Sequence, residues 1–160
     1  MLILIEGNEG SGKTTLINQL AERIPFVTVK YPKNVKDNFD MLANFASDEK
    51  HTFVLDRSFI SDMVYRNLDH EKGQMNLYEI GTLCTFYDGI KIVFCWNDKS
   101  FENSMKRGED NIVDEHVHRG INEAFMNIRT LIECFTDLRY YNYNYEYDSV
   151  ESIIDFIGGK

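Results

Sequence analysis

The sequence LILIEGNEGSGKTT, residues 2–15, places an unbroken apolar run directly before a glycine-rich segment. A continuous apolar run that ends at Gly7 predicts a strand buried on both faces, as in a parallel sheet. Residues 7–14 match the pattern GxxxxGK[ST], and apolar residues then recur at helical spacing until Pro25. This stretch therefore predicts a strand, a phosphate-binding loop and a helix, in that order.

The loop carries the residues that a nucleotide site needs. Its glycines let backbone N–H groups converge on one anion, and the N-terminus of the next helix adds partial positive charge. Lys13 is expected to reach the β- and γ-phosphates of ATP, and the hydroxyl of Thr14 to ligate Mg²⁺. A glycine-rich turn with an incidental Lys-Thr pair is the simpler alternative, which the strand and helix on either side disfavour. The residues expected to bind the nucleotide are Gly7, Asn8, Glu9, Gly10, Ser11, Gly12, Lys13, Thr14 and Thr15.

Strand and helix patterns alternate along the rest of the chain. Further strands are predicted at residues 26–30, 52–55, 90–96 and 138–147, and helices at residues 35–45, 60–68, 75–87, 113–132 and 150–157. This alternation predicts an α/β fold of the P-loop NTPase kind, with a five-stranded parallel sheet between helices. The chain has 160 residues, 43% of them apolar, and no repeat or linker, so we expect a single domain over residues 1–160.

Charge and cysteine content restrict the partners and the compartment. A net charge of -9 argues against a broad surface for nucleic acid or an anionic membrane, because such partners need a positive field. A small anionic substrate is still compatible, since local cations and N–H groups can hold its phosphates. The three cysteines lack metal or redox spacing, and no signal peptide or membrane-spanning stretch is evident, so we expect a cytoplasmic protein. The oligomeric state is left open, a homodimer included.

A phosphate-binding loop does not name the reaction, because GTPases, motor ATPases and small-molecule kinases share it. A GTPase would carry DxxG after the third strand and NKxD after a later one. Those places hold Asp56-Arg57-Ser58-Phe59 and Asn97-Asp98-Lys99-Ser100, and neither fits. Asp56 ends the third predicted strand, where a carboxylate can hold Mg²⁺ through water; capping of the next helix is its alternative role.

Three segments resemble the thymidylate kinase and deoxynucleoside kinase superfamily, across nearly the whole chain. The first, residues 5–15, resembles the thymidylate kinase pattern EGxDGSGKTT. The resemblance places Glu9 on an acidic position that faces the acceptor sugar in that family. Deoxynucleoside kinases share the Glu-Gly-Asn opening but carry an apolar or small residue in place of Glu9. The first segment therefore favours a monophosphate acceptor.

The second segment, residues 56–66, resembles the family pattern DRYxxSxxAYQ. The resemblance implies that Arg57 handles the acceptor phosphate or the transferring group, and that Ser61, Tyr65 and Arg66 belong to the substrate site. Arg66 departs from the usual glutamine, and Ser58-Phe59 resembles the ERS signature of deoxynucleoside kinases instead. A surface salt bridge is the alternative role of Arg57, disfavoured by its place at a strand's carboxyl end.

The third segment, Lys106-Arg107-Gly108-Glu109-Asp110, resembles the lid of these kinases and sets an expected lid at about residues 104–113. Because the P-loop has no arginine of its own, the resemblance implies Arg107, and less directly Lys106, as the catalytic cation. A solvated charged loop is the alternative. The expected catalytic residues are Lys13, Asp56, Arg57 and Arg107, with Thr14 and Asp56 at the metal.

One stretch departs from the family. Tyr31-Pro32-Lys33-Asn34 and one helix stand where family members have Arg-Glu-Pro-Gly or Phe-Pro-Glu and a longer helical segment. Deoxynucleoside kinases place a glutamate base for the 5′-hydroxyl near this point, and none stands here. A phosphate acceptor is already a nucleophile and needs no base. Lys33 either pairs with an acceptor phosphate or is solvated.

The leading expectation is an ATP- and Mg²⁺-dependent kinase acting on a deoxynucleoside monophosphate such as thymidylate. A deoxynucleoside kinase acting on a 5′-hydroxyl and a non-catalytic nucleotide-binding protein are the alternatives, and charge disfavours a polynucleotide kinase. The base and sugar stay open. Tyr145, Tyr147 and Asp148 lie where the family borders adenine, but the tyrosines are equally compatible with packing on an edge strand.

Overall fold

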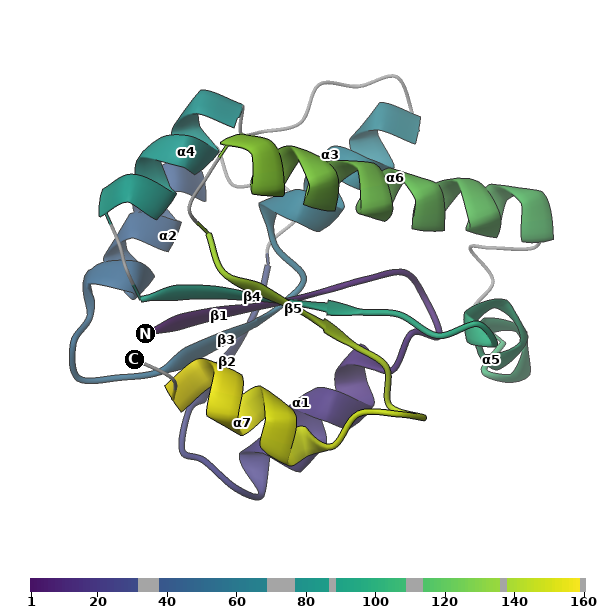
Figure 1. Ribbon diagram of the computed structural model, residues 1–160, viewed down its shortest axis with the longest axis horizontal. Helices are drawn as coiled ribbons and strands as arrows, with labels where there is room; N and C mark the ends of the chain where they lie inside the picture. The colour runs from purple at the N-terminus through teal and green to yellow at the C-terminus, as the bar shows by residue number, and fades with distance from the viewer. Residues whose placement is uncertain (32–37, 69–76, 87–88, 109–113, 136–137, 159–160) are drawn as a thin grey trace.

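The structure of the chain is a computed structural model that describes residues 1–31, 38–68, 77–86, 89–108, 114–135 and 138–158 (Figure 1). Strands and helices alternate along it, as the sequence predicts. The strands are β1 (Leu2–Glu6), β2 (Val27–Lys30), β3 (Phe53–Asp56), β4 (Ile90–Cys95) and β5 (Tyr140–Tyr143). The helices are α1 (Lys13–Ala21), α2 (Asn38–Ser47), α3 (Phe59–Leu68), α4 (Leu77–Phe86), α5 (Ser100–Lys106), α6 (Glu115–Phe135) and α7 (Val150–Gly158).

The strands form one parallel sheet in the order β2-β3-β1-β4-β5. The central strand β1 is in register with both neighbours, so that Ile5 lies beside Asp56 of β3 and Val93 of β4. Because the strands are parallel, their carboxyl ends meet at one edge, where ligands of open α/β sheets bind. The predicted α/β fold with a five-stranded parallel sheet is confirmed.

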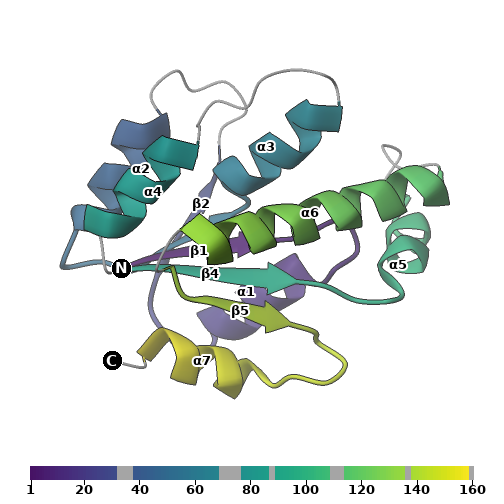
Figure 2. The same ribbon diagram turned by 45° about the horizontal axis from the view of Figure 1, so that its top comes forward.

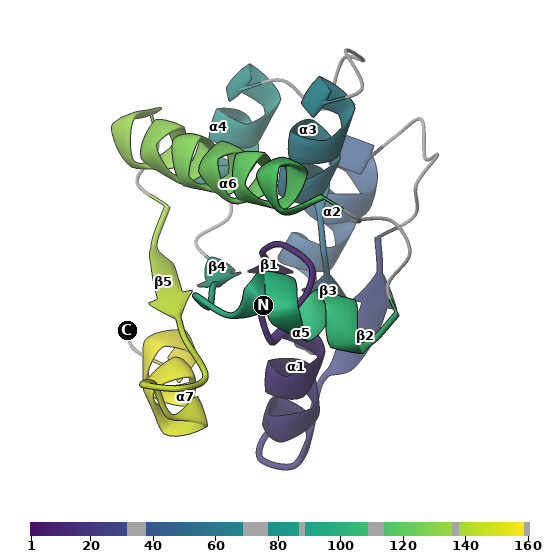
Figure 3. The ribbon, with the colours of Figure 1, turned by 90° about the vertical axis from the view of Figure 1, so that its right-hand side faces the viewer.

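Helices cover both faces of the sheet. Helices α1 and α7 lie on one face, and α2, α3, α4 and α6 on the other (Figures 1 and 2). The short helix α5 lies instead across the carboxyl edge, as the end-on view shows (Figure 3). The loop after β1 is therefore enclosed between the sheet, α5 and the start of α6.

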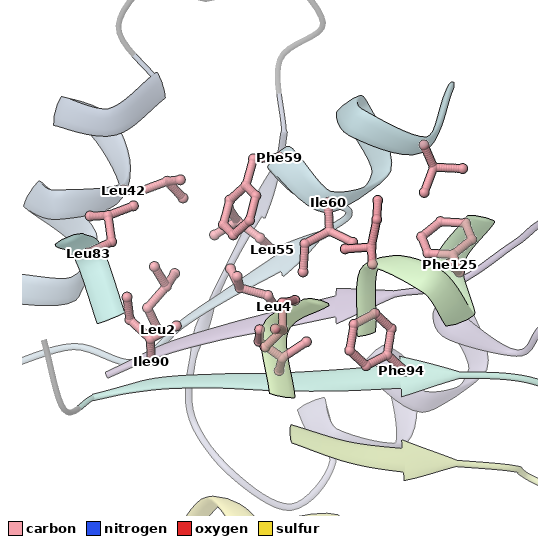
Figure 4. Close-up of a cluster of buried hydrophobic side chains, with 14 of the residues drawn as sticks. Leu2, Leu4, Leu42, Leu55, Phe59, Ile60, Leu83, Ile90, Phe94 and Phe125 are labelled. Atoms are coloured by element: carbon pink, nitrogen blue, oxygen red, sulfur yellow. The ribbon is translucent and has the colours of Figure 1, made fainter. Parts of the chain in front are cut away.

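The largest hydrophobic cluster lies between the sheet and the four-helix face (Figure 4). Alternate residues of β1 point into it, Leu2 and Leu4 among them, while Ile3 and Ile5 point to a second cluster under α1 and α7. Every residue of β1 and β4 is buried, which agrees with the predicted strand type. Each buried aliphatic or aromatic side chain among them contributes about 1.5–3 kcal/mol of burial free energy, so the sheet centre is a rigid base for the loop after β1.

The last strand is shorter than the period-two pattern predicts, because it ends at Tyr143 and not at Tyr147. Asn144 begins a turn there: its N–H donates to Asp148 Oδ2 (2.7 Å), and its carbonyl accepts from Tyr147 N (3.0 Å) and Asp148 N (2.8 Å). These bonds replace the ladder to β4. Tyr145 and Tyr147 therefore lie in a loop after the strand, and the edge-strand role expected for them is wrong.

Two further features differ from the sequence patterns. Helix α5 has only seven residues, too few for a period to be recognised, and the sequence predicts no helix there. Val117 belongs to the predicted apolar stripe of α6 but is 47% exposed, because the stripe is buried only from Ile121 onward. Val113, the first residue of that stripe, lies outside the described residues. In the part of the chain described, no helix is long and apolar enough to cross a membrane.

Candidate active site

The loop after β1 has a backbone that glycine must supply. Gly10 and Gly12 have φ angles of 71° and 95°, in the left-handed region that side chains disfavour. Space is also missing: a Cβ on Gly12 would lie 2.6 Å from Cδ1 of Tyr145, and one on Gly10 would overlap the carbonyl oxygen of Ser100. The loop thus packs tightly against α5 and the loop after β5, which gives it one defined shape.

Lys13 turns back into this loop. Its Nζ donates to the carbonyl oxygens of Gly7 (2.9 Å) and Asn8 (2.6 Å), and the residue is 7% exposed. Burial, reinforced by the nearby charge of Arg57, lowers the pKa of Lys13 to about 8. A bound anion would favour the charged form of Lys13 and oppose this lowering.

The loop also fits a polyphosphate in its other donors. Ser11 Oγ is buried and has no hydrogen-bond partner among the described residues, which is uncommon for a buried hydroxyl. Thr14 and Thr15 are exposed in the first turn of α1, and Asp56 is half-buried at the end of β3. The described residues contain no cluster of three or more His, Cys, Asp or Glu side chains. Mg²⁺ in phosphate sites needs only one or two protein ligands besides phosphate and water, so Thr14 and Asp56 fit that role.

A charged cluster lies on the β3 side of the loop. Arg57 donates from Nη2 to Glu9 Oε1, and its guanidinium carbon lies 5.1 Å from the ring centroid of Tyr65. Tyr65 in turn donates to Asn8 Oδ1 (3.5 Å). The structure thus brings together three of the residues predicted to contact substrate, from the P-loop, the β3–α3 turn and α3.

The other predicted substrate residues have partners of their own. Arg66 pairs through Nε with Asp62 (2.7 Å), one turn earlier on α3. Ser61 donates to Oε2 of Glu6 (2.5 Å), and Ser58 donates to Oε1 of the same carboxylate. Glu6 was missed as a site residue by the sequence analysis. An acidic residue at the end of a fully buried strand was the signal that could have found it.

On the opposite side, hydrogen bonds tie the loop to α6, and another joins α5 to the segment after β5. Asn8 Nδ2 donates to the carbonyl of His118 (3.0 Å) and to Asn122 Oδ1 (3.1 Å), and a ring nitrogen of His118 lies 3.2 Å from the carbonyl oxygen of Glu9. Asn103 of α5 donates to the hydroxyl of Tyr145 (2.8 Å). No sequence signal marks these contacts, because their partners lie 42 to 114 positions apart.

A cavity of about 380 Å³ adjoins this amide side between β4, β5 and α6. Phe94, Trp96, Phe125 and Met126 line it together with Gly7 and Asn8 of the loop. Neither Lys13 nor Arg57 is among its lining residues. The charged cluster and the cavity therefore lie on different sides of the loop.

The predicted lid is described in part. Lys106 ends α5, and Arg107 caps it, with its backbone N–H donating to the carbonyl of Ser104 (3.1 Å). Both side chains are exposed, and residues 109–113 of the lid lie outside the described residues. Lid motion and the catalytic role of Arg107 thus stay predictions.

Known proteins resemble this chain in part of its sequence and in its fold. No protein-family model matches the chain. An adenylate kinase isoenzyme 6 homolog from Caenorhabditis elegans is 28% identical over 111 residues, which are 66% of this chain and 59% of that protein. The chain thus spans less than two thirds of the length of this relative.

Two solved structures match nearly the whole chain. The YorR protein from Bacillus subtilis, in complex with phosphorylated GDP, has a TM-score of 0.76 and 17% identity, covering 98% of this chain and 93% of its own. Deoxyadenosine kinase from M. mycoides with bound dCTP has a TM-score of 0.62 and 17% identity, covering all of both chains. The fold is therefore that of the P-loop NTPases. The expected resemblance to P-loop nucleotide kinases is confirmed as a likeness, in sequence to the adenylate kinase homolog and in fold to these two structures.

Proposed function

We propose that the protein is a kinase that transfers the γ-phosphoryl group of ATP to a deoxynucleoside monophosphate of the thymidylate kind. The observation that carries the proposal is the adjacency of two sites at the ends of β1 and β3. The buried ammonium of Lys13 lies in the glycine-rich loop, and Arg57 lies beside that loop, in contact with Glu9 and Tyr65. A loop that can hold one phosphate chain, next to a second cation, can bring two phosphate-bearing substrates side by side for phosphoryl transfer.

The donor nucleotide would be held by the loop N–H groups, by Ser11 and by Lys13. Thr14 and Asp56 would hold Mg²⁺, which supplies positive charge to the phosphate oxygens when bound. Phosphoryl transfer depends mainly on positioning and on cations around the phosphoryl group. Lys13 supplies one such charge from the loop, Arg57 one from the β3 side, and Arg107 one from the lid at residues 104–113.

A monophosphate acceptor is favoured because no carboxylate of the described site is poised as a base. Glu6 is engaged by two serine hydroxyls, Glu9 by Arg57, and Asp62 by Arg66. Asp56 is the carboxylate that we assign to Mg²⁺ and not to a base. Strand β2 leads into Tyr31, whose pKa burial raises further above neutrality, so the phenol stays protonated. A 5′-hydroxyl acceptor would need a base at this point, whereas a phosphate would not.

The alternative acceptor is a deoxynucleoside, which the similarity to deoxyadenosine kinase of M. mycoides supports. A protein that binds nucleotide without transfer is a third reading. For all three we propose one domain over residues 1–160, a small-molecule partner and not nucleic acid, and a cytoplasmic location. The net charge of -9 supports the choice of partner.

The test is acceptor-dependent ADP release from ATP and Mg²⁺, measured across deoxynucleoside monophosphates and the matching nucleosides. We expect the monophosphates, thymidylate among them, to give the higher kcat/KM. A better rate with thymidine, deoxycytidine or deoxyadenosine would transfer the assignment to the nucleoside kinase. Nucleotide binding without acceptor-dependent release would favour the non-catalytic protein.

A further inference from the structure

Glu6 is a buried carboxylate for which the proposed function so far has no role. It is the last residue of β1 and has no exposed surface. Its two oxygens each accept one hydrogen bond, Oε1 from Ser58 Oγ and Oε2 from Ser61 Oγ. Both serines are themselves buried. A buried charge is costly unless it is paired and hydrogen-bonded, so this arrangement is a built one.

Ser58 links this carboxylate to the start of α3. The hydroxyl of Ser58 accepts from Ile60 N (3.3 Å), and its carbonyl accepts from Asp62 N (3.2 Å), which caps the helix. Since the Ser58 proton is donated to Glu6, a lone pair of the hydroxyl remains for Ile60. Glu6 thus orients the residue that begins α3.

The residue before Ser58 is Arg57, and its backbone is unusual. Among the described non-glycine residues, Arg57 has the positive φ, at 71°. Such a conformation costs about 1–2 kcal/mol and persists only where the surroundings impose it. Arg57 N donates to the carbonyl of Ile5 (3.1 Å). Consecutive residues after β3, Arg57 and Ser58, are therefore bonded to consecutive residues of β1, Ile5 and Glu6.

The charges of Arg57 and Lys13 also act on Glu6. Burial raises the pKa of Glu6 above its ordinary value, and the two serine hydrogen bonds and the charges of Arg57 and Lys13 oppose this effect only in part. The two serines, and then the two cations that the proposed reaction uses, therefore favour the charged form of Glu6 against the effect of burial. In its charged form Glu6 is a counter-charge for Arg57 and Lys13. No substrate can reach it, because its side chain has no exposed surface.

We propose that Glu6 is a positioning residue: through Ser58 it holds Arg57 in its left-handed conformation, where the guanidinium meets Glu9 and Tyr65 and can receive the acceptor. This inference rests on the proposed function. It assigns Ser61 to the support of Glu6. Loss of the Glu6 carboxylate should impair use of the acceptor far more than binding of ATP, because Lys13 and the loop backbone remain.

A double-mutant cycle tests this role, with Glu6→Gln, Arg57→Ala and the double variant. We expect Glu6→Gln to lower kcat/KM for the acceptor about tenfold or more, the size of one charge-assisted hydrogen bond, with the ATP Kd within about twofold. In the Arg57→Ala background the same change should add little, because the two act as a unit. Glu123→Gln, an isosteric change at an exposed position of α6, is the matched control. Losses that add independently would overturn the proposal.

A second measurement does not depend on turnover. The Nε–Hε signal of Arg57 in ¹⁵N NMR spectra, assigned by its loss in Arg57→Lys, should shift in Glu6→Gln and in the milder Ser61→Ala but stay in place in Glu123→Gln. An unmoved signal in a folded Glu6→Gln or Ser61→Ala variant would overturn the inference. If the wild-type protein shows no acceptor-dependent turnover, the proposed kinase fails separately, and this signal still decides whether Glu6 positions Arg57.

Discussion

The two sides of the P-loop are built from different chemistry. Toward β3 and α3 the contacts include ion pairs, Arg57 with Glu9 and Arg66 with Asp62. Toward β4, β5 and α6 they join neutral amides: Asn8 bonds Asn122, and Asn97 bonds Asn144 (3.2 Å). We refer to these as the charged side and the amide side.

The two kinds of contact suit different roles, one in the reaction and one in holding the fold together. A partly buried arginine needs an anionic partner, and a phosphate can take the place of the carboxylate that it contacts. Neutral amide bonds contribute about 0.5–1.5 kcal/mol each and do not compete for an anion. We therefore expect changes on the charged side to act on turnover, and changes on the amide side to act on stability.

The largest expected effect is that of Lys13→Ala. Its ammonium neutralises charge that develops during transfer, so turnover should fall by about a thousandfold or more while the fold is kept. Turnover under saturating ATP, acceptor and Mg²⁺, together with the circular dichroism spectrum, checks this. Near-wild-type turnover would contradict the catalytic role of the loop.

Arg107→Ala extends the comparison to the lid. An arginine worth about 3 kcal/mol in the transition state corresponds to roughly a hundredfold loss of kcat, with ATP affinity changed far less. Arg107→Lys should recover part of it, since lysine keeps the charge but lacks the planar fork. The measurement is kcat and ATP Kd beside Lys106→Ala. If Lys106→Ala alone lowers the rate, the catalytic cation is misassigned; if neither does, the loop is no catalytic lid.

The buried charge of Lys13 should also appear in the pH dependence of stability. The pKa of Lys13 is lowered from 10.5 to about 8 in the folded protein, so between these pH values the unfolded chain binds more protons. The free energy of unfolding contributed by Lys13 should then rise with pH across this window, by on the order of 3 kcal/mol, and be lost as pH falls through 8. Urea unfolding of the wild type and of Lys13→Met at pH 7 to 10.5 gives the contribution of Lys13 as the difference between the two free energies of unfolding. Parallel curves would mean that Lys13 is not desolvated.

The smallest effect is expected on the amide side. Asn97→Ala removes the donor to Asn144 Oδ1, which keeps its bond from Glu146 N (3.0 Å), and it removes the acceptor of the part-buried Lys99 N (2.8 Å). The free energy of unfolding should fall by about 1 kcal/mol, with kcat within a fewfold of wild type. Urea unfolding and turnover measure the two, and Asn127→Ala, at an exposed position of α6, is the control. If the loss of kcat, converted to free energy, exceeds the loss in the free energy of unfolding, the distinction between the two sides is wrong.

Much of the fold could be predicted because its signals are local. The apolar run of β1, the glycine pattern after it and the helical spacing of Leu16, Leu20 and later residues all lie within a few positions of one another. The same holds for the residues that we propose to bind phosphate. Gly10, Gly12 and Lys13 act through their own backbone and their immediate neighbours, and the predicted loop has the expected shape.

The remaining features depend on which strands become neighbours. Only the β1–β3 pairing puts Glu6 against Ser58 and Ser61, which are more than 50 positions away in the sequence. The same pairing places the left-handed Arg57 beside Ile5. Likewise, only the packing of α6 over the sheet brings His118 and Asn122 to Asn8. The sequence by itself determined the strand, the cradle and the order of elements, because period and turn chemistry are local properties. Tertiary structure decided what flanks the cradle, because hydrogen bonds between distant residues exist only once register and crossovers are set.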